Sequence, residues 1–576
     1  MELVIDDPSR FDLRYTAIDP FDKPAMLASQ FQGWDHDSIT ATNGCMLLDI
    51  VYGDDQPHYF VQEFYRNMLP EYPSHEREDI HSIPWIDQFI EVPAWNAALG
   101  LAELREVVPV MSDQYRYGFH IPITVRLDGR SIPGYAIHHH LAHAAISFYR
   151  SDFSEAAILT NDGFGIFPGY HSGMYYLGKA EGLYPLWPHH LTIGYLYEQV
   201  SAILGLGAGG SSGKLMGLAG HGSPRFFDSR FVGNCNDFQG TFTDVSRSWI
   251  EHCLDSARSE GYDLSRFSDP RYAMVPVNAD IAASTQKLFE MTRSEAVRSL
   301  KSQLDNMDQG VSNLCLGGGT ALNCPSNSSI ALSFDFESTY VDPACDDSGV
   351  AIGAALAAYH SILGLPRVFS RTNPYLGPCY PDTVTEDALA ALEDSIVFER
   401  QADPAISAAA DLDEGLIIGW FEGGSECGPR ALGHRSILAD PRQAENALRV
   451  NQIKGREVWR PFAPAVLVKE ASAWFENVPI PSPYMLFNAF VKSNLIPAVT
   501  HVDHSARIQT VDRSCGKFYE LIEHFYTKTG VPVVLNTSLN GPGEPIVETP
   551  RDALALLLSR NLDVLYLGHY RVVRLR

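Results

Sequence analysis

A recurring unit of local structure constrains this chain more than any other feature: a short apolar run, a glycine turn, then a helix-like stretch. Residues 156–160 and 312–316 are apolar runs typical of buried strands, and glycine follows each closely. From about residue 280 to residue 301, apolar residues recur at helical spacing, at Ile281, Leu288, Met291, Ala296 and Leu300. Strands that alternate with helices across short glycine turns are typical of α/β proteins. We therefore predict an α/β fold.

The same pattern occurs on both sides of a segment rich in structure-breaking residues. Residues 416–421 and 531–535 are further buried-strand runs. Between the two parts, residues 362–385 contain four prolines and two glycines, which interrupt regular structure. A chain of 576 residues also exceeds what one hydrophobic core usually supports. We predict two domains, residues 1–365 and 385–576, and we expect about the first 30 residues, which show little pattern, to be an extension.

Charge and cysteine usage exclude several classes of protein. The formal net charge of −27 repels phosphate backbones at long range, so we expect no nucleic acid partner. The nine cysteines form no C-x-x-C pair, which argues against a zinc ribbon or a disulfide framework. The N-terminus lacks the basic and apolar segments of a signal peptide, and no run of 18 uncharged apolar residues is present. We expect a cytoplasmic protein without a membrane span.

The most distinctive local feature is a run of histidines at residues 138–143, His-His-His-Leu-Ala-His. On a helix, His139 and His143 share one face, and this spacing lets two imidazoles bind one metal ion. Asp162, after the strand at 156–160, and Asp347, in an acidic turn before a helix, are candidate oxygen ligands. A set of histidines that bind no metal is the alternative, and the residues leave both interpretations open.

Two glycine-rich segments, residues 207–217 and 317–323, are candidate phosphate-binding turns. Glycine lets backbone N–H groups approach a phosphate, and a helix N-terminus favours the anion. Gly213 and Lys214 resemble the end of a P-loop, but Leu215 stands where that motif requires serine or threonine. Simple tight turns between strand and helix explain each segment equally well.

Basic residues are concentrated in one part of this acidic chain. Residues 423–460 contain seven basic residues against four acidic ones. Arginine grips phosphate oxygens with a planar fork. Arg430 and Arg460 stand among proline, glycine and apolar residues, which favours a pocket over a solvated face. Polar residues 536–538 follow the run at 531–535, and strand ends of this kind bind ligands in open α/β sheets, although turn capping is the alternative.

Together these segments resemble the O-carbamoyltransferase family, which includes nodulation-factor, aminoglycoside, ansamycin and cephamycin carbamoyltransferases. The matching segments are HHLAHAA at 139–145, GKLMGLAGHG at 213–222, GGGTALN at 317–323, SECGPRALGHRS at 425–436, REVWRPFAP at 456–464, RIQTV at 507–511 and LNTS at 535–538. Their order and spacing extend from about residue 137 to about residue 550.

The resemblance implies a fold and a two-step reaction. Residues 1–365 would form an actin-like ATPase domain similar to the tRNA threonylcarbamoyl-transferase, and residues 385–576 would resemble threonylcarbamoyl-adenylate synthase. The second domain would make carbamoyl-adenylate from carbamoyl phosphate and ATP and release pyrophosphate. The first domain would pass the carbamoyl group to a hydroxyl of a small natural product. ATP is thus an expected co-substrate, and a homodimer is the expected assembly.

The resemblance also assigns residues. His139, His143, Asp162 and Asp347 match the family's metal ligands, for iron or alternatively magnesium. Contacts to nucleotide and carbamoyl phosphate are implied for Lys214, Gly318, Asn323, Arg430, Arg456, Arg507, Asn536, Thr537 and Ser538, and catalytic roles for Lys454 and Arg460. His36 aligns with the family's catalytic histidine, although family members place this turn directly after a first strand and here about 30 residues precede it.

Two other functions remain in view. A tRNA threonylcarbamoyl-type transferase shares both fold types, but the acidity of the chain and the order of the fused domains disfavour it. A non-catalytic, actin-like nucleotide-binding protein would bind ATP without releasing pyrophosphate, and it leaves the arginines of residues 423–460 unexplained. The sequence does not identify the acceptor.

Overall fold

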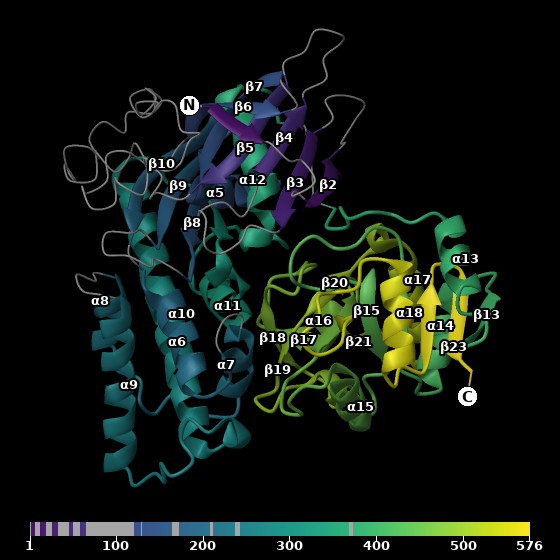
Figure 1. The fold of residues 1–576 in the computed structure, drawn as a ribbon. Coiled ribbons are helices and arrows are strands. Elements are labelled where there is room, and N and C mark those ends of the chain that lie inside the picture. Colours follow the sequence, from purple (N-terminus) through teal and green to yellow (C-terminus); the bar gives the residue numbers. More distant parts are fainter. Residues whose placement is uncertain are drawn as a thin grey trace.

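The computed structural model describes residues 137–163, 172–189, 191–207, 211–236, 242–367 and 373–575, together with the backbone of the strands within residues 2–138. Figure 1 shows two α/β bodies side by side: the N-terminal body, residues 2–362, with a helical extension below its sheets, and the C-terminal body, residues 382–574. The mixed α/β character predicted from the sequence is confirmed. The finer assignment of an actin-like architecture to the first body stays a prediction.

A seven-stranded sheet opens the N-terminal body, in the order β1-β6-β7-β5-β4-β3-β2. Its strands are β1 Glu2–Ile5, β2 Asp12–Ile18, β3 Met26–Gln32, β4 Cys45–Asp49, β5 His58–Phe64, β6 His120–Leu127 and β7 Arg130–His138. The prediction that the first 30 residues form an extension is wrong, since β1, β2 and most of β3 lie there. In β2, Leu13, Tyr15 and Ala17 alternate with other residues, a period-two pattern that is easily missed in so short a segment.

A second, five-stranded sheet has the order β10-β9-β8-β11-β12. Its strands are β8 Ala156–Asn161, β9 Gly173–Lys179, β10 Gly182–His189, β11 Asn313–Gly317 and β12 Ser338–Val341. The predicted strands at 156–160 and 312–316 are confirmed as β8 and β11. These two strands pair in parallel, so their carboxyl ends lie together and bring Asp162 and Gly318 to one edge of the sheet.

Two short helices fill the space between these sheets (Figure 1). Helix α5, His139–Tyr149, packs on β8 and β11, and helix α12, Val350–Leu356, packs on β3, β4 and β5. The helices contact each other so closely that a Cβ atom at Gly353 would collide with the backbone carbonyl of Ala142. Alanine and glycine in both segments permit this approach, which fixes where α5 presents its histidines.

Among the described residues, six helices form the extension of the N-terminal body, and the longest is α10. They are α6 Ile193–Ile203, α7 Ser212–Ala219, α8 Arg230–Asn236, α9 Phe242–Ser259, α10 Pro276–Asn306 and α11 Cys324–Ser333. The predicted helix at 280–301 is confirmed as part of α10, which packs against α6, α7, α8 and α11. Within the described ranges, no helix combines the length and the apolar character needed to cross a membrane.

An eight-stranded sheet forms the C-terminal body, in the order β13-β23-β22-β14-β15-β21-β16-β20. Its strands are β13 Ile396–Arg400, β14 Ile418–Phe421, β15 Arg435–Ala439, β16 Ala463–Leu467, β20 Gln509–Val511, β21 Val533–Ser538, β22 Val564–Leu567 and β23 Tyr570–Arg574. The three-stranded sheet beside it comprises β17 Phe475–Glu476, β18 Asn488–Val491 and β19 Ser505–Arg507.

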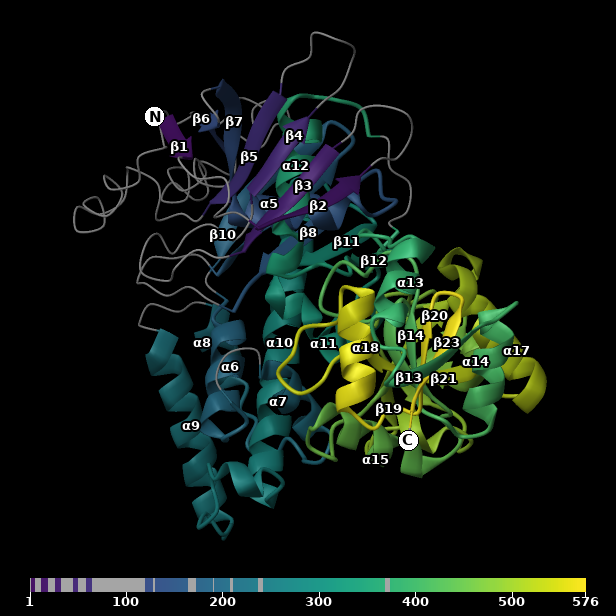
Figure 2. The same ribbon diagram turned by 45° about the vertical axis from the view of Figure 1, so that its right-hand side comes forward.

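Helices cover both faces of the eight-stranded sheet (Figure 2). On one face lie α14 Pro404–Asp413 and α17 Gly516–Thr529, and on the other lie α13 Asp382–Ala390 and α18 Pro550–Ser559. The remaining helices are α15 Ala444–Lys454 and α16 Ala471–Trp474. The prediction that residues 536–538 follow a strand is wrong, because β21 continues through them and pairs with β15 as far as Ser538.

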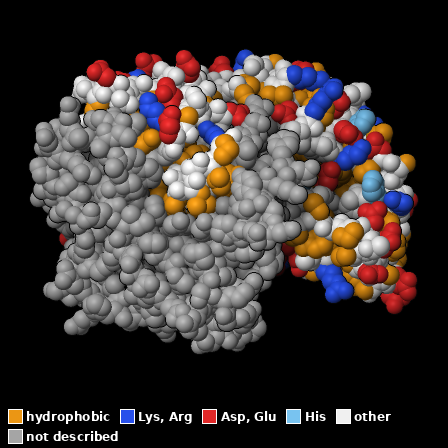
Figure 3. Space-filling model, turned by 90° about the horizontal axis from the view of Figure 1, so that it is seen from above, with side chains coloured by type: hydrophobic (Ala, Val, Ile, Leu, Met, Phe, Trp, Pro, Cys, Tyr) orange, Lys and Arg blue, Asp and Glu red, His pale blue; other side chains and the backbone are white. Residues whose placement is uncertain are grey.

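Hydrogen bonds join the two bodies along α11 and β18. The Oγ atom of Ser328 donates to the carbonyl of Asn488 at 2.8 Å, and Nδ2 of Asn327 donates to the carbonyl of Leu486 at 2.9 Å. An ion pair of 2.9 Å between Lys214 and Glu457 adds a second connection. Leu486 and Phe487 also pack into a hydrophobic core of the N-terminal body. On the face seen from above, acidic and basic side chains are scattered among hydrophobic ones over the described surface (Figure 3).

Replacing Gly353 with valine should destabilise the protein, because the new side chain must push α12 away from α5. We expect a loss of about 1–3 kcal/mol in the free energy of unfolding, measured as a lower urea midpoint. The matched control is Gly233→Ala in α8, where a Cβ atom meets nothing within 4 Å. That control should leave the midpoint unchanged or raise it, and equal midpoints for the two variants would contradict the tight helix contact.

Candidate active site

Two imidazoles and two carboxylates converge at the carboxyl edge of the five-stranded sheet. The Nε2 atoms of His139 and His143 are 3.1 Å apart. Oδ2 of Asp162 lies 2.6 Å from Nε2 of His139 and 3.2 Å from Nε2 of His143. Oδ1 of Asp347 lies 3.6 Å and 3.4 Å from the same two nitrogens. The structure thus brings together the four residues predicted as metal ligands, with their ligand atoms all within 4.8 Å of one another.

Local structure holds each of these side chains in place. The two histidines lie one turn apart on α5, and Asp162 directly follows β8. The backbone amide of Gly319 donates to Oδ1 of Asp162 at 2.5 Å, which leaves Oδ2 for the histidines. Gly318 permits this turn because its φ of 83° favours glycine, and a side chain there would collide with the backbone of Asn161.

The electrostatics of the cluster favour a bound cation. Burial opposes a charged imidazole, but the Asp162 carboxylate outweighs it and raises the pKa of His143 to about 9. The pKa of Asp162 is lowered well below its usual value, because the neighbouring histidines outweigh the effect of burial. Two imidazoles and two carboxylates around one point suit iron or another divalent transition metal better than magnesium, which prefers oxygen ligands alone. The residues present therefore fit the metal that the family resemblance implies.

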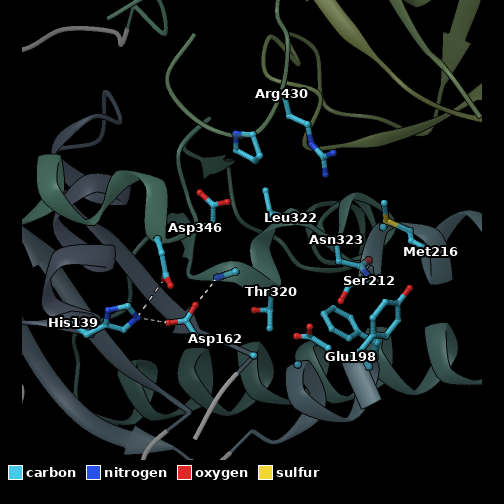
Figure 4. A pocket seen from close by; sticks show the side chains of 18 of the residues that line it. His139, Asp162, Glu198, Ser212, Met216, Thr320, Leu322, Asn323, Asp346 and Arg430 are labelled. Carbon is cyan, nitrogen blue, oxygen red and sulfur yellow. Dashed lines mark hydrogen bonds and ion pairs between the residues drawn. The ribbon is translucent and has the colours of Figure 1, made fainter. Parts of the chain in front are cut away.

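A cavity of about 580 Å³ opens beside this cluster. Figure 4 shows His139 and Asp162 at one end of the cavity, Ser212 and Asn323 at the other, and Arg430 entering from the C-terminal body. We call it the histidine cavity. Its walls combine a few apolar side chains, such as Phe289, with many polar and charged groups, which suits a polar small molecule.

A second cavity, of about 470 Å³, lies between the two bodies and is rich in arginine. We call it the arginine cavity, and its lining includes Arg430, Arg456, Arg460, Arg507, Asn536, Thr537 and Ser538. All seven were predicted to contact nucleotide or carbamoyl phosphate, or to act in catalysis. The Nε atoms of Arg430 and Arg507 are buried and have no hydrogen-bond partner among the described residues.

Cations in and beside the arginine cavity crowd one another. Burial and the nearby Arg460 and Arg507 lower the pKa of Arg456 to about 9. Burial and Arg430 lower the pKa of Arg507 to about 9. Burial, with Arg456 and Arg460 nearby, also lowers the pKa of Lys454 to about 7. Each shift means that the positive charge is disfavoured as the site stands, so an anion bound here would be stabilised strongly.

The two cavities share part of their walls. Gly213, Met216, Pro429, Arg430 and Arg460 line both of them. Arg460 is also held by Glu457, whose carboxylate lies 3.6 Å from the guanidinium and pairs with Lys214 on the other side. The histidine cavity and the arginine cavity are therefore adjoining compartments with arginines at their common wall.

The other predicted site residues take different positions. Lys214, Gly318 and Lys454 are absent from the described residues that line the two cavities. Lys214 lies within α7 and pairs with Glu457, and Lys454 donates to the backbone carbonyl and the Oγ atom of Ser538. Asn323 lines the histidine cavity, but its side chain also caps α11 and bonds to Gln286. His36 lies outside the described residues.

Several cavity residues were missed by sequence reasoning. His140 and Asp346 line the histidine cavity directly beside predicted ligands, and the runs His138–His140 and 346–347 carried that signal. Glu198 lies on α6, whose pattern is that of an ordinary amphipathic helix, so no local signal marks it. His501 and Asp503 line the arginine cavity from the turn before β19.

Comparisons with known proteins identify the family of the chain. Two family models match the chain: Carbamoyltransferase N-terminus over residues 111–356 and Carbamoyltransferase C-terminus over residues 409–574. Nodulation protein NolO of Bradyrhizobium diazoefficiens is 36% identical over 450 residues, which cover 76% of this chain and 78% of NolO. Nodulation protein NolNO of Sinorhizobium fredii is 37% identical over 450 residues, covering 76% of this chain and 63% of NolNO.

A cephem O-carbamoyltransferase is also similar. The 3'-hydroxymethylcephem-O-carbamoyltransferase of Amycolatopsis lactamdurans is 36% identical over 298 residues, which cover 50% of this chain and 52% of that enzyme. A crystal structure of T. kodakarensis HypF matches 39% of this chain and 36% of its own, with 15% identity and a TM-score of 0.20. That score is too low to say anything about the fold.

Removing both imidazoles should abolish metal binding. We expect the double variant His139→Ala, His143→Ala to lose the metal that elemental analysis finds in the wild-type protein, because two of four ligand atoms are gone. The control His252→Ala removes a histidine of α9 that bonds to the carbonyl of Phe226, and it should retain the metal. Unchanged metal content in the double variant would disprove this site.

ATP binding should be accompanied by proton uptake near pH 8. Lys454, with a pKa of about 7, is mostly neutral there, and bound phosphates would raise its pKa and protonate it. Calorimetry in buffers of different ionisation enthalpy would measure this uptake. Lys454→Met should reduce it, while the exposed Lys469→Met should not. The same proton count in wild type and Lys454→Met would refute the role of Lys454.

Proposed function

The chain belongs to the carbamoyltransferase family, and from that premise we propose that it is an O-carbamoyltransferase. It forms carbamoyl-adenylate from carbamoyl phosphate and ATP and transfers the carbamoyl group to a hydroxyl of a small-molecule natural product. The observation that best supports this proposal is the pair of adjoining cavities, one rich in unneutralised arginine and one beside the His–Asp cluster. Each cavity has the chemistry that one half of the reaction needs.

The arginine cavity suits the first half-reaction, because both substrates, carbamoyl phosphate and ATP, are anions. Water cleaves carbamoyl phosphate to carbamate and inorganic phosphate, and a carbamate oxygen then attacks the α-phosphorus of ATP. The bond from the α-phosphorus to the bridging oxygen breaks, and pyrophosphate leaves. Arg456, Arg460 and Arg507 supply planar guanidinium groups for the phosphates and stabilise the charge that builds on the pyrophosphate leaving group.

The histidine cavity suits the second half-reaction. The acceptor hydroxyl attacks the carbonyl carbon of carbamoyl-adenylate, and AMP leaves with the bridging oxygen. An alcohol is a poor nucleophile at neutral pH, so a base must take its proton as the attack proceeds. We assign that role to His36, on the strength of the family resemblance alone. A metal ion held by His139, His143, Asp162 and Asp347 would neutralise negative charge on the phosphate of the departing AMP.

The shared wall explains how one chain combines the two steps. Carbamoyl-adenylate is a reactive mixed anhydride that water destroys. Arg430 and Arg460 line both cavities and offer positive charge to its phosphate during passage from one to the other. A short path lined by protein shields the intermediate from hydrolysis better than release into solution does.

Removing an arginine from the arginine cavity should stop the first half-reaction. We expect Arg460→Ala and Arg507→Ala each to lower pyrophosphate release, because a buried charged contact to phosphate is lost at a cost of about 2–5 kcal/mol. Arg400→Ala is the matched control, since Arg400 is exposed and pairs only loosely with Asp382. Normal pyrophosphate release by both cavity variants would place adenylation elsewhere.

Replacing His36 should separate the two half-reactions. His36→Asn is expected to form carbamoyl-adenylate normally, while acceptor carbamoylation falls by roughly 10²–10⁴-fold, the usual effect of losing a positioned proton acceptor. One preparation assayed both for pyrophosphate and for carbamoylated product gives the comparison. Retention of both activities would remove His36 from the mechanism, and equal loss of both would indicate misfolding.

A further inference from the structure

The first half-reaction needs a base in the arginine cavity, because water must lose a proton as it cleaves carbamoyl phosphate. The side chains assigned to that cavity are guanidinium, amide and hydroxyl groups, which are poor proton acceptors. Lys454 is not among the described residues that line the cavity. Its Nζ contacts the carbonyl and Oγ of Ser538 and Oδ1 of Asn540, so it is not placed to take a proton from a water molecule in the cavity.

His501 lines the same cavity as the arginines, and a neighbouring carboxylate fixes the orientation of its imidazole. Its Nδ1 atom lies 3.3 Å from Oδ1 of Asp503. Its Nε2 atom is buried and has no hydrogen-bond partner in the described ranges of the chain. Only 9% of the side chain is exposed, so neighbouring groups hold the imidazole in place.

The contact with Asp503 determines the state of the imidazole. A carboxylate accepts from an N–H group, so Nδ1 carries the hydrogen and the lone pair is left on Nε2. Asp503 is itself fixed, because Oδ1 also accepts from the backbone amide of Ser505 at 3.0 Å. Its pKa is lowered to about 2 by the hydrogen bonds from His501 and Ser505, which outweigh burial, so it stays ionised. The pair Asp503–His501 thus presents a basic nitrogen.

Other titratable groups near this pair fit the role less well. His221, in the loop after α7, lies edge-on to His501 with ring centroids 5.1 Å apart, and its Nε2 bonds to the carbonyl of Trp459 at 3.4 Å. Glu290 lines the cavity from α10, but its carboxylate already accepts a hydrogen bond from Nε2 of Gln286 at 2.9 Å. His221 therefore already uses its Nε2 atom, and Glu290 already accepts a hydrogen bond. Among these three residues, His501 alone combines a carboxylate partner on one nitrogen with an unbonded second nitrogen.

We propose that His501, oriented by Asp503, is the general base that activates water to cleave carbamoyl phosphate in the arginine cavity. This inference rests on the proposed function. The water oxygen attacks the carbonyl carbon, and its proton passes to Nε2 of His501. The bond from the carbonyl carbon to the phosphate oxygen breaks, and His501 returns the proton to the departing phosphate. Carbamic acid remains. It loses its second proton to solvent, and the resulting carbamate attacks ATP, so no oxidant or further reactant is needed.

The test supplies the product of the proposed step directly. His501→Gln is assayed for pyrophosphate release from ATP in two arms, one with carbamoyl phosphate and one with ammonium carbamate. We expect release with carbamoyl phosphate to fall by about 10²–10⁴-fold, the usual range for a lost general base. Release with carbamate should stay near the wild-type level. Asp503→Asn should show the same split between the arms, because it removes only the orientation of the imidazole.

The controls separate this inference from the proposed function and from a structural role. His504→Asn changes an exposed histidine of the same turn, and asparagine tolerates its φ of 63°, so both arms should be normal. Equal loss in both arms for His501→Gln, or no loss in either, would overturn the role of His501. Absence of carbamate-dependent pyrophosphate release in the wild-type protein would instead overturn the proposed function.

Discussion

Several cations are buried together between the two bodies, with too few carboxylates to neutralise them, and the proposed reaction depends on this electrostatic constraint. Glu457 is the one carboxylate found within salt-bridge distance of Arg460, and among the described residues no carboxylate lies within that distance of Arg430 or Arg507. Such an arrangement is unfavourable by itself, as the lowered pKa values of Arg456 and Arg507 indicate. In the reaction that we propose, the phosphates of ATP and carbamoyl phosphate neutralise these cations, in a chain whose overall charge is strongly negative.

Packing of small residues provides the second half of the site. The close contact between α5 and α12 holds the histidines of α5 at the end of β8, where Asp162 emerges. The same edge of the five-stranded sheet carries the glycine turn that positions the carboxylate. Because the hydrogen bonds of α11 with β18 join this body to the C-terminal body, the two cavities meet along one wall.

The sequence allowed us to predict the features that short-range patterns encode. The histidines spaced four residues apart and the arginines among proline and glycine were predicted as site residues, and they lie at the two cavities. Prediction failed where the outcome depends on strand pairing or on distant partners. The strands in the first 30 residues have only a short period-two pattern, and the pairing that extends β21 through Ser538 comes from β15. The pairing of Lys214 with Glu457 likewise joins residues 243 positions apart in a chain of 576.

We propose that the carbamoyl group reaches its acceptor through carbamoyl-adenylate. Tracing the carbonyl oxygen of carbamoyl phosphate tests whether this intermediate forms. Carbamoyl phosphate labelled with ¹⁸O at the carbonyl would be incubated with the enzyme, ATP and a hydroxyl acceptor, and the AMP analysed by mass spectrometry. If a carbamate oxygen attacks the α-phosphorus and stays there when the acceptor attacks the carbonyl, part of the AMP must carry the label. Carbamoylated product formed together with unlabelled AMP, or without any AMP, would contradict the account.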